Sequence, residues 1–366
     1  MKLSPDVTRC TKNKRRETVQ THVFHFSNFS VIASAVRPDD DVIHIGGTHT
    51  DSPHLSQKWS SLEEAIEKVS AKANDMEDKN RIHGTGYAGC KFGIFAHDPS
   101  CLRGPQRAEL FKHLGQVLDF YGGRLYTGAD VETDLFDLMV ILQVCPWVLG
   151  KPLRYGGCDD PSKYTANAIV QIQKKIMPII RPASPEFRGK RIAIKGAAGK
   201  VGRFIVMNLF REGANLAVAD LNIDGIEEIR HAYPGVEPRH PDAIHMTHAP
   251  IFCPADTTVT IPNRLTVDQF RCDAIIGSAN DQNRSSELED LLFYRDKRIL
   301  HPSINGALEN GAGLLAVVNE LKEGGFSQQA LEANIEQLVQ KTVDICSEAI
   351  QRNIPPYKIV EERYLK

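Results

Sequence analysis

A glycine-rich run between two apolar segments is the feature of this 366-residue chain that most limits the folds it can adopt. The run is KGAAGKVG, and it joins RIAIKG, an apolar stretch typical of a strand, to VGRFIVMNLFREG, which has helical spacing. A second strand pattern, NLAVAD, follows that helix. The order strand, glycine loop, helix, strand predicts the opening βαβ unit of a parallel sheet.

The glycines of this loop and a downstream aspartate predict a dinucleotide site. Gly196, Gly199 and Gly202 leave room for backbone amides to approach a pyrophosphate at the helix N-terminus. Asp220 ends the next strand, where a carboxylate accepts hydrogen bonds from both adenosine ribose hydroxyls. Because this charge repels a 2′-phosphate and no basic residue follows directly, NAD is favoured over NADP. The alternative to a cofactor site is that the glycines form a tight strand-to-helix turn and that Asp220 is solvated. The loop and strand-end residues expected at the cofactor are Gly196, Gly199, Lys200, Val201, Gly202 and Asp220.

The length and the turn signals indicate two domains, because so long a chain exceeds one small core. Strand patterns begin near His22, and helical patterns alternate with them before the long helix pattern TANAIVQIQKKIMPII. We expect an α/β protein with an N-terminal α/β domain over 1–160 and a Rossmann domain over 161–327. The amphipathic segment 328–366 can pack back on the first domain or on the second.

Charge and composition narrow the class of partner. The chain has 44 Lys+Arg and 46 Asp+Glu, a formal charge of -2, so no net basic field attracts nucleic acid or an anionic membrane. No apolar run approaches the roughly 18 residues of a membrane helix, and no signal-peptide core is present, so a cytoplasmic location is expected. The eight cysteines lack a C-x-x-C pair, which predicts reduced thiols and no zinc framework. We expect a small-molecule partner and no metal.

A glycine-rich segment between two lysines carries the most specific resemblance to known proteins. In KNRIHGTGYAGCKFGI, Lys79 and Asn80 open the segment, Gly84 and Gly89 follow, and Lys91 closes it. This spacing resembles that of the glutamate/leucine/phenylalanine/valine dehydrogenase family, and most closely its leucine and phenylalanine branches. The resemblance implies an NAD-dependent L-amino-acid dehydrogenase, which interconverts an amino acid with a 2-oxo acid and ammonia. It also implies that the first domain binds substrate and supports a homo-oligomer.

Three charged residues inherit roles from this resemblance. Lys79 would bind the substrate carboxylate, and Lys91 would be the catalytic base. Two ammonium groups in one desolvated pocket also depress each other's pKa, and a lysine lowered toward neutrality can take a proton. In GRLYTGADVET, Asp130 matches the family's catalytic aspartate, which would hold Lys91 and relay protons. The alternative to these roles is that Lys79 and Lys91 are surface charges and that Asp130 lies on a loop facing solvent.

Further matches extend the resemblance over most of the chain. Thr165 in GGCDDPSKYTA would lie near the nicotinamide, Asn280 in IIGSAND would contact cofactor and substrate, and Asn310 in NGAGLL would contact the cofactor. Leucine-type enzymes carry alanine where this chain has Gly128, which implies about one methyl group of extra room. A bulky aliphatic or aromatic side chain is therefore expected in an apolar pocket. The residues expected to line that pocket are Ile45, Gly46, Gly128, Leu314 and Val317.

Four departures from the family pattern keep other functions open. The glycine loop is one residue longer than usual, His49 stands where the family carries arginine, and Asp281 replaces an asparagine. Glu309 replaces an apolar residue, and it either points into the site to bind a cationic or hydroxylated side chain or faces solvent. These changes permit a biosynthetic oxidoreductase that acts on an imine or an unusual amino acid. An NAD-binding regulatory protein is a third hypothesis.

Overall fold

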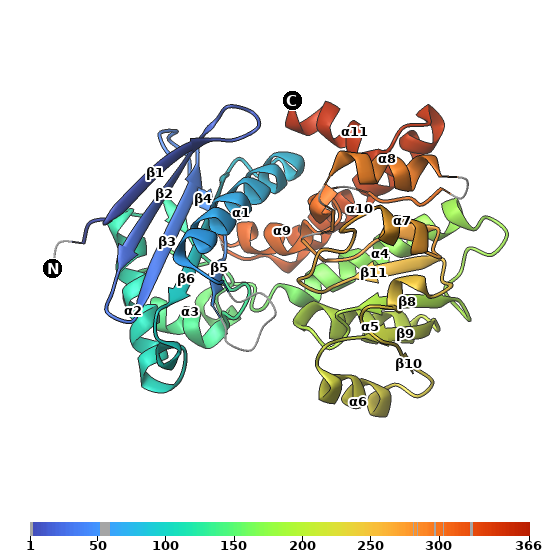
Figure 1. Cartoon of the computed structure of the whole chain (residues 1–366), viewed down its shortest axis with the longest axis horizontal. Coiled ribbons are helices and arrows are strands. Elements are labelled where there is room, and N and C mark those ends of the chain that lie inside the picture. Colours follow the sequence, from blue (N-terminus) through green and yellow to red (C-terminus); the bar gives the residue numbers. More distant parts are fainter. Residues whose placement is uncertain are drawn as a thin grey trace. The chain divides into compact units, whose positions relative to one another are not determined.

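The computed structural model describes residues 3–51, 59–280, 282–283, 285–295, 298–302, 304–322 and 325–366. It divides the chain into two compact units (Figure 1). The first unit contains Met1–Asp160 and Ala316–Ser327, and the second contains Pro161–Leu315 and Gln328–Lys366. Both units combine helices with a sheet, so the expected α/β class is confirmed.

Within the described residues, the first unit is built on a seven-stranded mixed sheet with the order β1-β2-β3-β6-β4-β7, to which β5 is joined through β6. The first four strands along this order are antiparallel, whereas β4, β5 and β7 run parallel to the strands they pair with. The strands are β1 (Val7–Lys12), β2 (Thr18–His25), β3 (Phe29–Val36), β4 (His44–Ile45), β5 (Thr48–Thr50), β6 (Ala88–Ala96) and β7 (Leu125–Tyr126).

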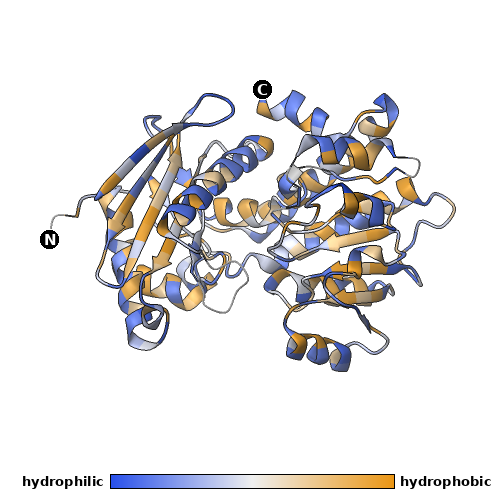
Figure 2. Cartoon of the chain, viewed as in Figure 1, coloured by the Kyte–Doolittle hydropathy of each residue, from blue (hydrophilic) through white to orange (hydrophobic). Residues whose placement is uncertain are grey.

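Helices cover both faces of this sheet because neighbouring strand residues point to opposite sides. Ile32 packs with Val69 of α1 (Leu62–His83) in one apolar cluster. Val31, the preceding residue, belongs to a second cluster with α2 (Gly104–Phe120) and α3 (Leu135–Ile141). The short 3-10 helices η1 (Pro99–Leu102) and η2 (Leu153–Tyr155) complete the N-terminal part of the unit. Figure 2 shows the central strands mainly hydrophobic and the outer helices mixed.

The second unit contains the parallel sheet that the glycine loop predicts. Its described strands have the order β10-β9-β8-β11-β12, and every pair is parallel. α5 (Lys200–Arg211) connects β8 to β9, and α6 (Ile223–Ala232) connects β9 to β10. The chain then returns to the other side of β8, so the strand order reverses between β8 and β11. Open α/β sheets bind ligands outside the carboxyl ends of the strands at such a reversal. The strands are β8 (Arg191–Lys195), β9 (Asn215–Ala219), β10 (Glu237–Pro238), β11 (Ile251–Pro254) and β12 (Ala274–Ile275).

The remaining helices of this unit surround the sheet and lead to the C-terminus. Their order starts with the long helix α4 and ends with the short helices that follow α10. They are α4 (Ser162–Ile180), η3 (Ile244–Met246), α7 (Arg264–Gln269), α8 (Ser286–Tyr294), η4 (Ile304–Gly306), α10 (Gln328–Arg352), α11 (Pro356–Val360) and η5 (Glu361–Leu365). The helix α9 (Ala312–Asn319) begins in this unit, and its residues from Ala316 onward belong to the first unit.

The C-terminal part of the chain differs from the expected division. Residues 316–327 join the first unit, whereas 328–366 belong to the second unit and not to the first. Within the second unit α10 packs on α4, and both helices bury apolar residues such as Ile335 and Ile172. An apolar stripe requires a partner surface but does not identify it, and here the long apolar helix α4 supplies that surface.

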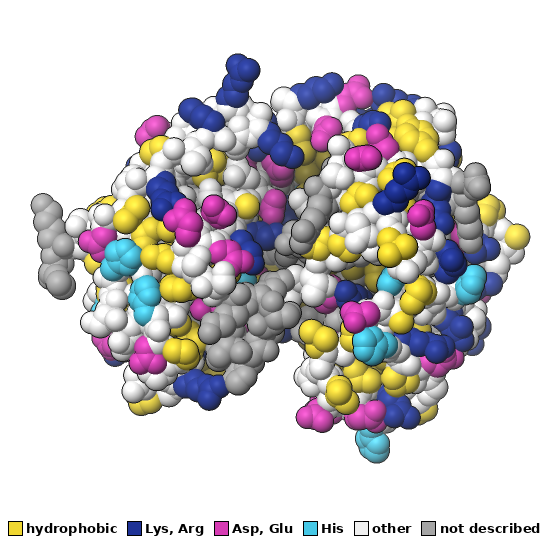
Figure 3. Space-filling view, in the orientation of Figure 1, with side chains coloured by type: hydrophobic (Ala, Val, Ile, Leu, Met, Phe, Trp, Pro, Cys, Tyr) yellow, Lys and Arg dark blue, Asp and Glu magenta, His cyan; other side chains and the backbone are white. Residues whose placement is uncertain are grey.

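Two surface properties bear on possible partners. On the face shown in Figure 3, basic side chains are interspersed with acidic ones. In the part of the chain that the structure describes, no helix combines the length and the apolar character needed to span a membrane.

Candidate active site

Lys91 and Asp130 form an ion pair in the first unit. Lys91 lies on β6 opposite Ser34 of β3, and only 7% of its side chain is exposed. Its Nζ donates a hydrogen bond to Oδ2 of Asp130, whose side chain is 33% exposed. Burial raises the pKa of Asp130, but the charge and hydrogen bond of Lys91 outweigh burial, so the pKa lies below its ordinary value. The pair thus combines a shielded ammonium with a reachable, ionised carboxylate.

Two adjacent glycines permit this close arrangement. A Cβ atom at Gly46 would lie 1.9 Å from the carbonyl oxygen of Cys90, and one at Gly47 would lie 2.9 Å from Cβ of Asp130. The backbone amide of Gly46 donates to the oxygen of Tyr126 at 3.2 Å, which holds the segment against β7. Gly46 was expected among the substrate residues. A side chain at this position would meet the backbone of β6.

Lys79 belongs to the same cluster of charges. It lies near the end of α1 and is 8% exposed. Burial lowers its pKa to about 8, and this effect exceeds those of the neighbouring charges, among which Asp130 raises the pKa and Lys91 lowers it. Mutual repulsion of the two lysines is therefore a secondary cause, in contrast to the expectation. Lys79 is a buried cation that loses its charge at mildly alkaline pH.

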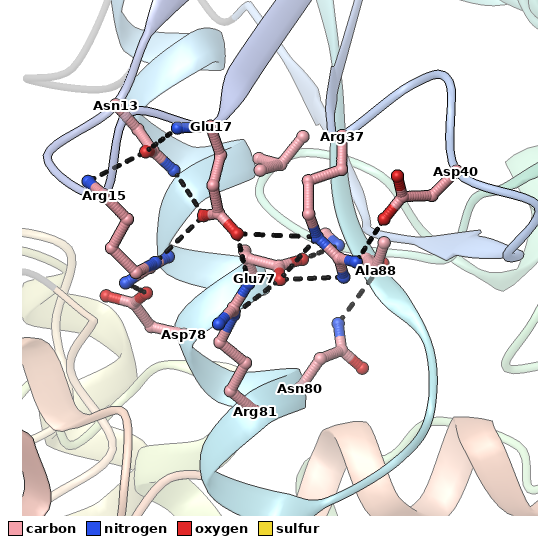
Figure 4. Close-up of polar contacts among 12 residues, drawn as sticks. Asn13, Arg15, Glu17, Arg37, Asp40, Glu77, Asp78, Asn80, Arg81 and Ala88 are labelled. Atoms are coloured by element: carbon pink, nitrogen blue, oxygen red, sulfur yellow. Dashed lines mark hydrogen bonds and ion pairs between the residues drawn. The ribbon is translucent and has the colours of Figure 1, made fainter. Parts of the chain in front are cut away.

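A buried glutamate that the sequence interpretation missed joins the elements that carry the two lysines (Figure 4). Glu77 is fully buried, and its Oε2 accepts the backbone N–H of Gly89 at 2.8 Å. Its Oε1 accepts hydrogen bonds from Arg37 at 3.0 Å and from Arg81 at 2.8 Å. The bond to Gly89 connects α1, two residues before Lys79, to β6, two residues before Lys91. The one available sequence signal was a carboxylate on the helix face expected to be buried.

The glycine loop in the second unit has the form needed to receive a pyrophosphate. Gly196 follows β8 with φ +81°, and Gly199 is the N-cap of α5. A Cβ atom at Gly202 would lie 2.0 Å from the oxygen of Gly196, so no side chain fits there. Lys200 and Val201 form the first turn of α5, whose backbone N–H groups favour an anion.

Asp220 lies at the end of β9 beside this loop. Its Oδ2 accepts the N–H of Ala198 at 2.9 Å, and its Oδ1 accepts the N–H of Asn222 at 2.9 Å. The carboxylate therefore anchors the longer glycine loop. Each carboxylate oxygen can accept a second hydrogen bond, so the contacts leave Asp220 able to bind ribose hydroxyls.

The structure also brings together two of the expected asparagines. Nδ2 of Asn310 donates to Oδ1 of Asn280 at 2.9 Å and to the oxygen of Ser278 at 2.7 Å. Thr165 lies on α4, with its Oγ1 2.9 Å from the position of a Cβ atom at Gly313. Asn280 and Asn310 thus form a polar pair within the second unit, to which Thr165 also belongs.

Comparison with known proteins identifies the family. No protein-family model matches the sequence. A phenylalanine dehydrogenase from Bacillus thermotolerans is 31% identical over 267 residues, which cover 72% of this chain and 67% of that protein. The chain belongs to the glutamate/leucine/phenylalanine/valine dehydrogenase family. The expected class, an oxidoreductase of the amino-acid dehydrogenase type, is thereby confirmed.

Other members of the dehydrogenase family match at similar levels. A leucine dehydrogenase from Thermoactinomyces intermedius is 28% identical, covering 83% of this chain and 81% of that protein. Among solved structures, an L-tryptophan dehydrogenase from Nostoc punctiforme superposes with a TM-score of 0.67 at 20% identity, covering 98% of this chain and 94% of that chain. A hetero-hexameric glutamate dehydrogenase from Thermus thermophilus superposes with a TM-score of 0.68 at 18% identity, covering 96% of this chain and 85% of that chain. The structures share the fold with this chain.

One departure from the dehydrogenase family pattern places an uncharged ring where an arginine is usual. His49 lies on β5, and its ring centroid is 4.6 Å from that of Trp59. Burial and, secondarily, the charge of Lys91 lower its pKa to about 4. His49 is therefore neutral at physiological pH. Asp281, another of these departures, lies outside the described residues.

The position of Glu309 differs from both expectations for it, a carboxylate that binds substrate and a carboxylate that faces solvent. It is fully buried, and its Oε1 accepts a hydrogen bond from Nε2 of Gln282 at 3.2 Å. Gln282 in turn contacts His301 at 2.8 Å, and His301 pairs with Glu289 at 2.7 Å. Glu309 therefore belongs to a buried polar network. It does not face solvent, and its contacts are with other side chains of the protein.

The expected pocket residues lie in both units. Ile45, which is buried, Gly128 and Val317 belong to the first unit, and Leu314 belongs to the second. A Cβ atom at Gly128 would lie 3.2 Å from the oxygen of Leu149. The position of a Cβ atom at Gly128 therefore adjoins the backbone of Leu149, and the extra room expected there stays a prediction.

Proposed function

We propose that this family member is an NAD-dependent L-amino-acid dehydrogenase for an apolar substrate with a bulky aliphatic or aromatic side chain. The reaction converts the amino acid, water and NAD⁺ into the 2-oxo acid, ammonium, NADH and a proton, and it is reversible. The observation that carries the proposal is the cluster of Lys79, Lys91 and Asp130, which combines two shielded cations with an ionised carboxylate.

The cluster supplies the groups that oxidative deamination requires. In its charged form, Lys79 binds the substrate carboxylate. A bound NAD would supply the oxidising power of the reaction by taking up the Cα hydride, and the residues proposed to hold it are those of the glycine loop and Asp220. Lys91 passes a proton to Asp130 and then acts as the base for the water that attacks the iminium carbon. Asp130 returns that proton to the carbinolamine nitrogen and takes up the hydroxyl proton as the C–N bond breaks, which gives the 2-oxo acid and ammonia.

The cofactor proposal is supported by the residues around the glycine loop. The backbone-lined bend at Gly196 and Gly202 fits a pyrophosphate, and Asp220 favours the free 2′-hydroxyl of NAD over the phosphate of NADP. We further propose that Thr165, Asn280 and Asn310 contact the nicotinamide end of the cofactor. In keeping with the family resemblance, the chain is proposed to be a cytoplasmic homo-oligomer, which sedimentation analysis of the purified protein tests.

An absorbance assay at 340 nm tests the function. The purified chain is given each of the twenty amino acids with NAD or NADP, and each 2-oxo acid with ammonia and NADH. The proposal requires turnover with leucine-, phenylalanine- or tryptophan-like substrates and a preference for NAD. A tenfold or larger preference for glutamate or lysine overturns the apolar-substrate assignment. No turnover with any of these amino acids, together with reduction of an imine, favours the alternative oxidoreductase that the His49, Asp281 and Glu309 departures suggest.

A further inference from the structure

A lysine, an aspartate and a threonine meet at the carboxyl ends of the two strands between which the order of the second sheet reverses. Lys195 ends β8, and Asp256 and Thr258 lie just after β11. Nζ of Lys195 donates to Oγ1 of Thr258 at 2.8 Å and lies 3.1 Å from Oδ2 of Asp256. Oγ1 of Thr258 donates to the same carboxylate oxygen at 2.6 Å. We call these three residues the Lys195 cluster.

The Lys195 cluster borders the glycine loop directly. A Cβ atom at Gly196 would lie 2.6 Å from the backbone nitrogen of Asp256. The N–H of Ala255 donates to the oxygen of Lys195 at 2.8 Å. Because β8 and β11 are neighbours at the reversal of strand order, the cluster lies where a sheet of this kind binds its ligand.

The cluster has hydrogen-bonding capacity that its internal contacts do not use. Oδ1 of Asp256 is buried and has no hydrogen-bond partner among the described residues. A buried carboxylate oxygen without a donor is energetically unfavourable, so a ligand hydroxyl would be stabilising there. The ammonium of Lys195 has three donors, and the cluster contacts account for two of them. The side chains of Lys195 and Asp256 as a whole remain 19% and 17% exposed, so a ligand can reach the cluster, and rotation of the Asp256 carboxylate would bring Oδ1 to that ligand.

The glycine loop therefore has a carboxylate on each flank. Asp220 ends β9 on one side of β8, and Asp256 follows β11 on the other side. A dinucleotide whose pyrophosphate lies on the loop extends one ribose toward each flank. We propose that Asp256 and Lys195 bind the hydroxyls of the nicotinamide ribose, while Asp220 binds those of the adenosine ribose. Lys195 also balances the charge of Asp256 beside the pyrophosphate. This inference rests on the proposed use of NAD.

Binding of cofactor fragments tests the inference without turnover. ADP contains only the adenosine ribose, whereas ADP-ribose and NADH contain a second ribose. Calorimetric titration of the full chain compares Asp256→Ala and Lys195→Met with Asp220→Ala, and Asp242→Asn, whose side chain is 90% exposed, is the control. Asp256→Ala and Lys195→Met should weaken ADP-ribose and NADH about tenfold and change ADP less than twofold, because a hydrogen bond to a charged group is lost. Asp220→Ala should weaken all three ligands.

Two results separate this inference from the proposed cofactor. If the wild-type chain binds ADP-ribose and NADH, and the Lys195 cluster variants bind them equally well, the inference fails and the NAD proposal stands. If Asp256→Ala weakens ADP binding as well, through damage to the loop, the inference requires that Asp256→Asn weakens binding of ADP-ribose and leaves binding of ADP unchanged. An equal loss of ADP in Asp256→Asn assigns the cluster to the fold alone and overturns the inference. A wild-type chain that binds none of the three ligands overturns both proposals.

Discussion

At the scale of single residues, the proposed chemistry depends on the contact between Lys91 and Asp130. Lys91→Ala removes the base, and Asp130→Asn removes the acceptor of its proton. Turnover should fall by several orders of magnitude in each variant, every tenfold being about 1.4 kcal/mol of barrier. NADH binding should be unchanged, because both residues are in the first unit and the glycine loop is in the second. Steady-state kinetics and fluorescence titration measure the two quantities. A near-normal kcat in either variant contradicts the mechanism.

The charge of Lys79 should make substrate binding depend on pH. Its pKa is lowered from 10.5 to about 8, so the ammonium that binds the carboxylate is lost above about pH 8. KM for the amino acid should rise as pH passes from 7 to 9, with a smaller change in kcat. Lys79→Arg keeps its charge and should remove this rise, whereas Lys79→Ala should raise KM at every pH. A KM of the wild type that stays constant from pH 7 to 10 excludes the assigned role.

The same pKa has a consequence for stability. The native state binds fewer protons than the unfolded state between pH 8 and 10.5 at this position. The contribution of Lys79 to the free energy of unfolding therefore increases as pH rises through that interval, and it is least favourable below pH 8.

Sequence reasoning reached some of these residues and missed others for a physical reason. Lys91 and Asp130 lie in segments with family spacing, and the structure brings them together. The sequence did not show the partners of Glu77, because Arg37, just after β3, and Gly89 of β6 are separated from it along the chain. Glu309 was misjudged in the same way, since only the fold places Gln282 beside it.

At the scale of elements, Glu77 should determine how firmly α1 is joined to β6. Glu77→Ala leaves Arg37, Arg81 and the N–H of Gly89 without their shared acceptor. Breaking a buried ion pair in this way costs about 3–5 kcal/mol. Glu67→Ala, an exposed position on the same helix, should change stability by less than about 0.5 kcal/mol.

Urea denaturation and hydrogen exchange at Gly89 measure this difference. Faster exchange of the Gly89 amide in Glu77→Ala, and not in Glu67→Ala, is the expected local result. Equal denaturation midpoints for the two variants would show that the Glu77 contacts add no stability.

Local pattern was sufficient to predict the elements but not all of their neighbours. The unit from β8 to β9 follows from residues that are close in sequence, and the structure contains it. The helix α10 was equally clear as a helix, yet its partner α4 lies far away in sequence. Burial of an apolar stripe is non-directional, so the pattern left the choice of domain open.

At the scale of the whole molecule, each unit is assembled from two stretches of chain. Residues 316–327 return to the first unit, where Glu320 accepts the N–H groups of Gly150 at 3.0 Å and Cys158 at 2.7 Å. Composition and periodicity gave no sign of this return, because the polar partners of Glu320 are far from it in the sequence. Lys91 and Asp130 belong to the first unit and the glycine loop to the second, so the proposed reaction draws on residues of both units.

Transfer of deuterium from substrate to cofactor tests the central claim most directly. The best amino acid from the substrate panel, deuterated at Cα, is incubated with NAD⁺ and the wild-type chain, and the products are analysed by mass spectrometry. The account predicts one deuterium in each NADH formed, together with one 2-oxo acid and one ammonium, and no transfer with Lys91→Ala. NADH that carries no deuterium, or that forms without the 2-oxo acid, would contradict it.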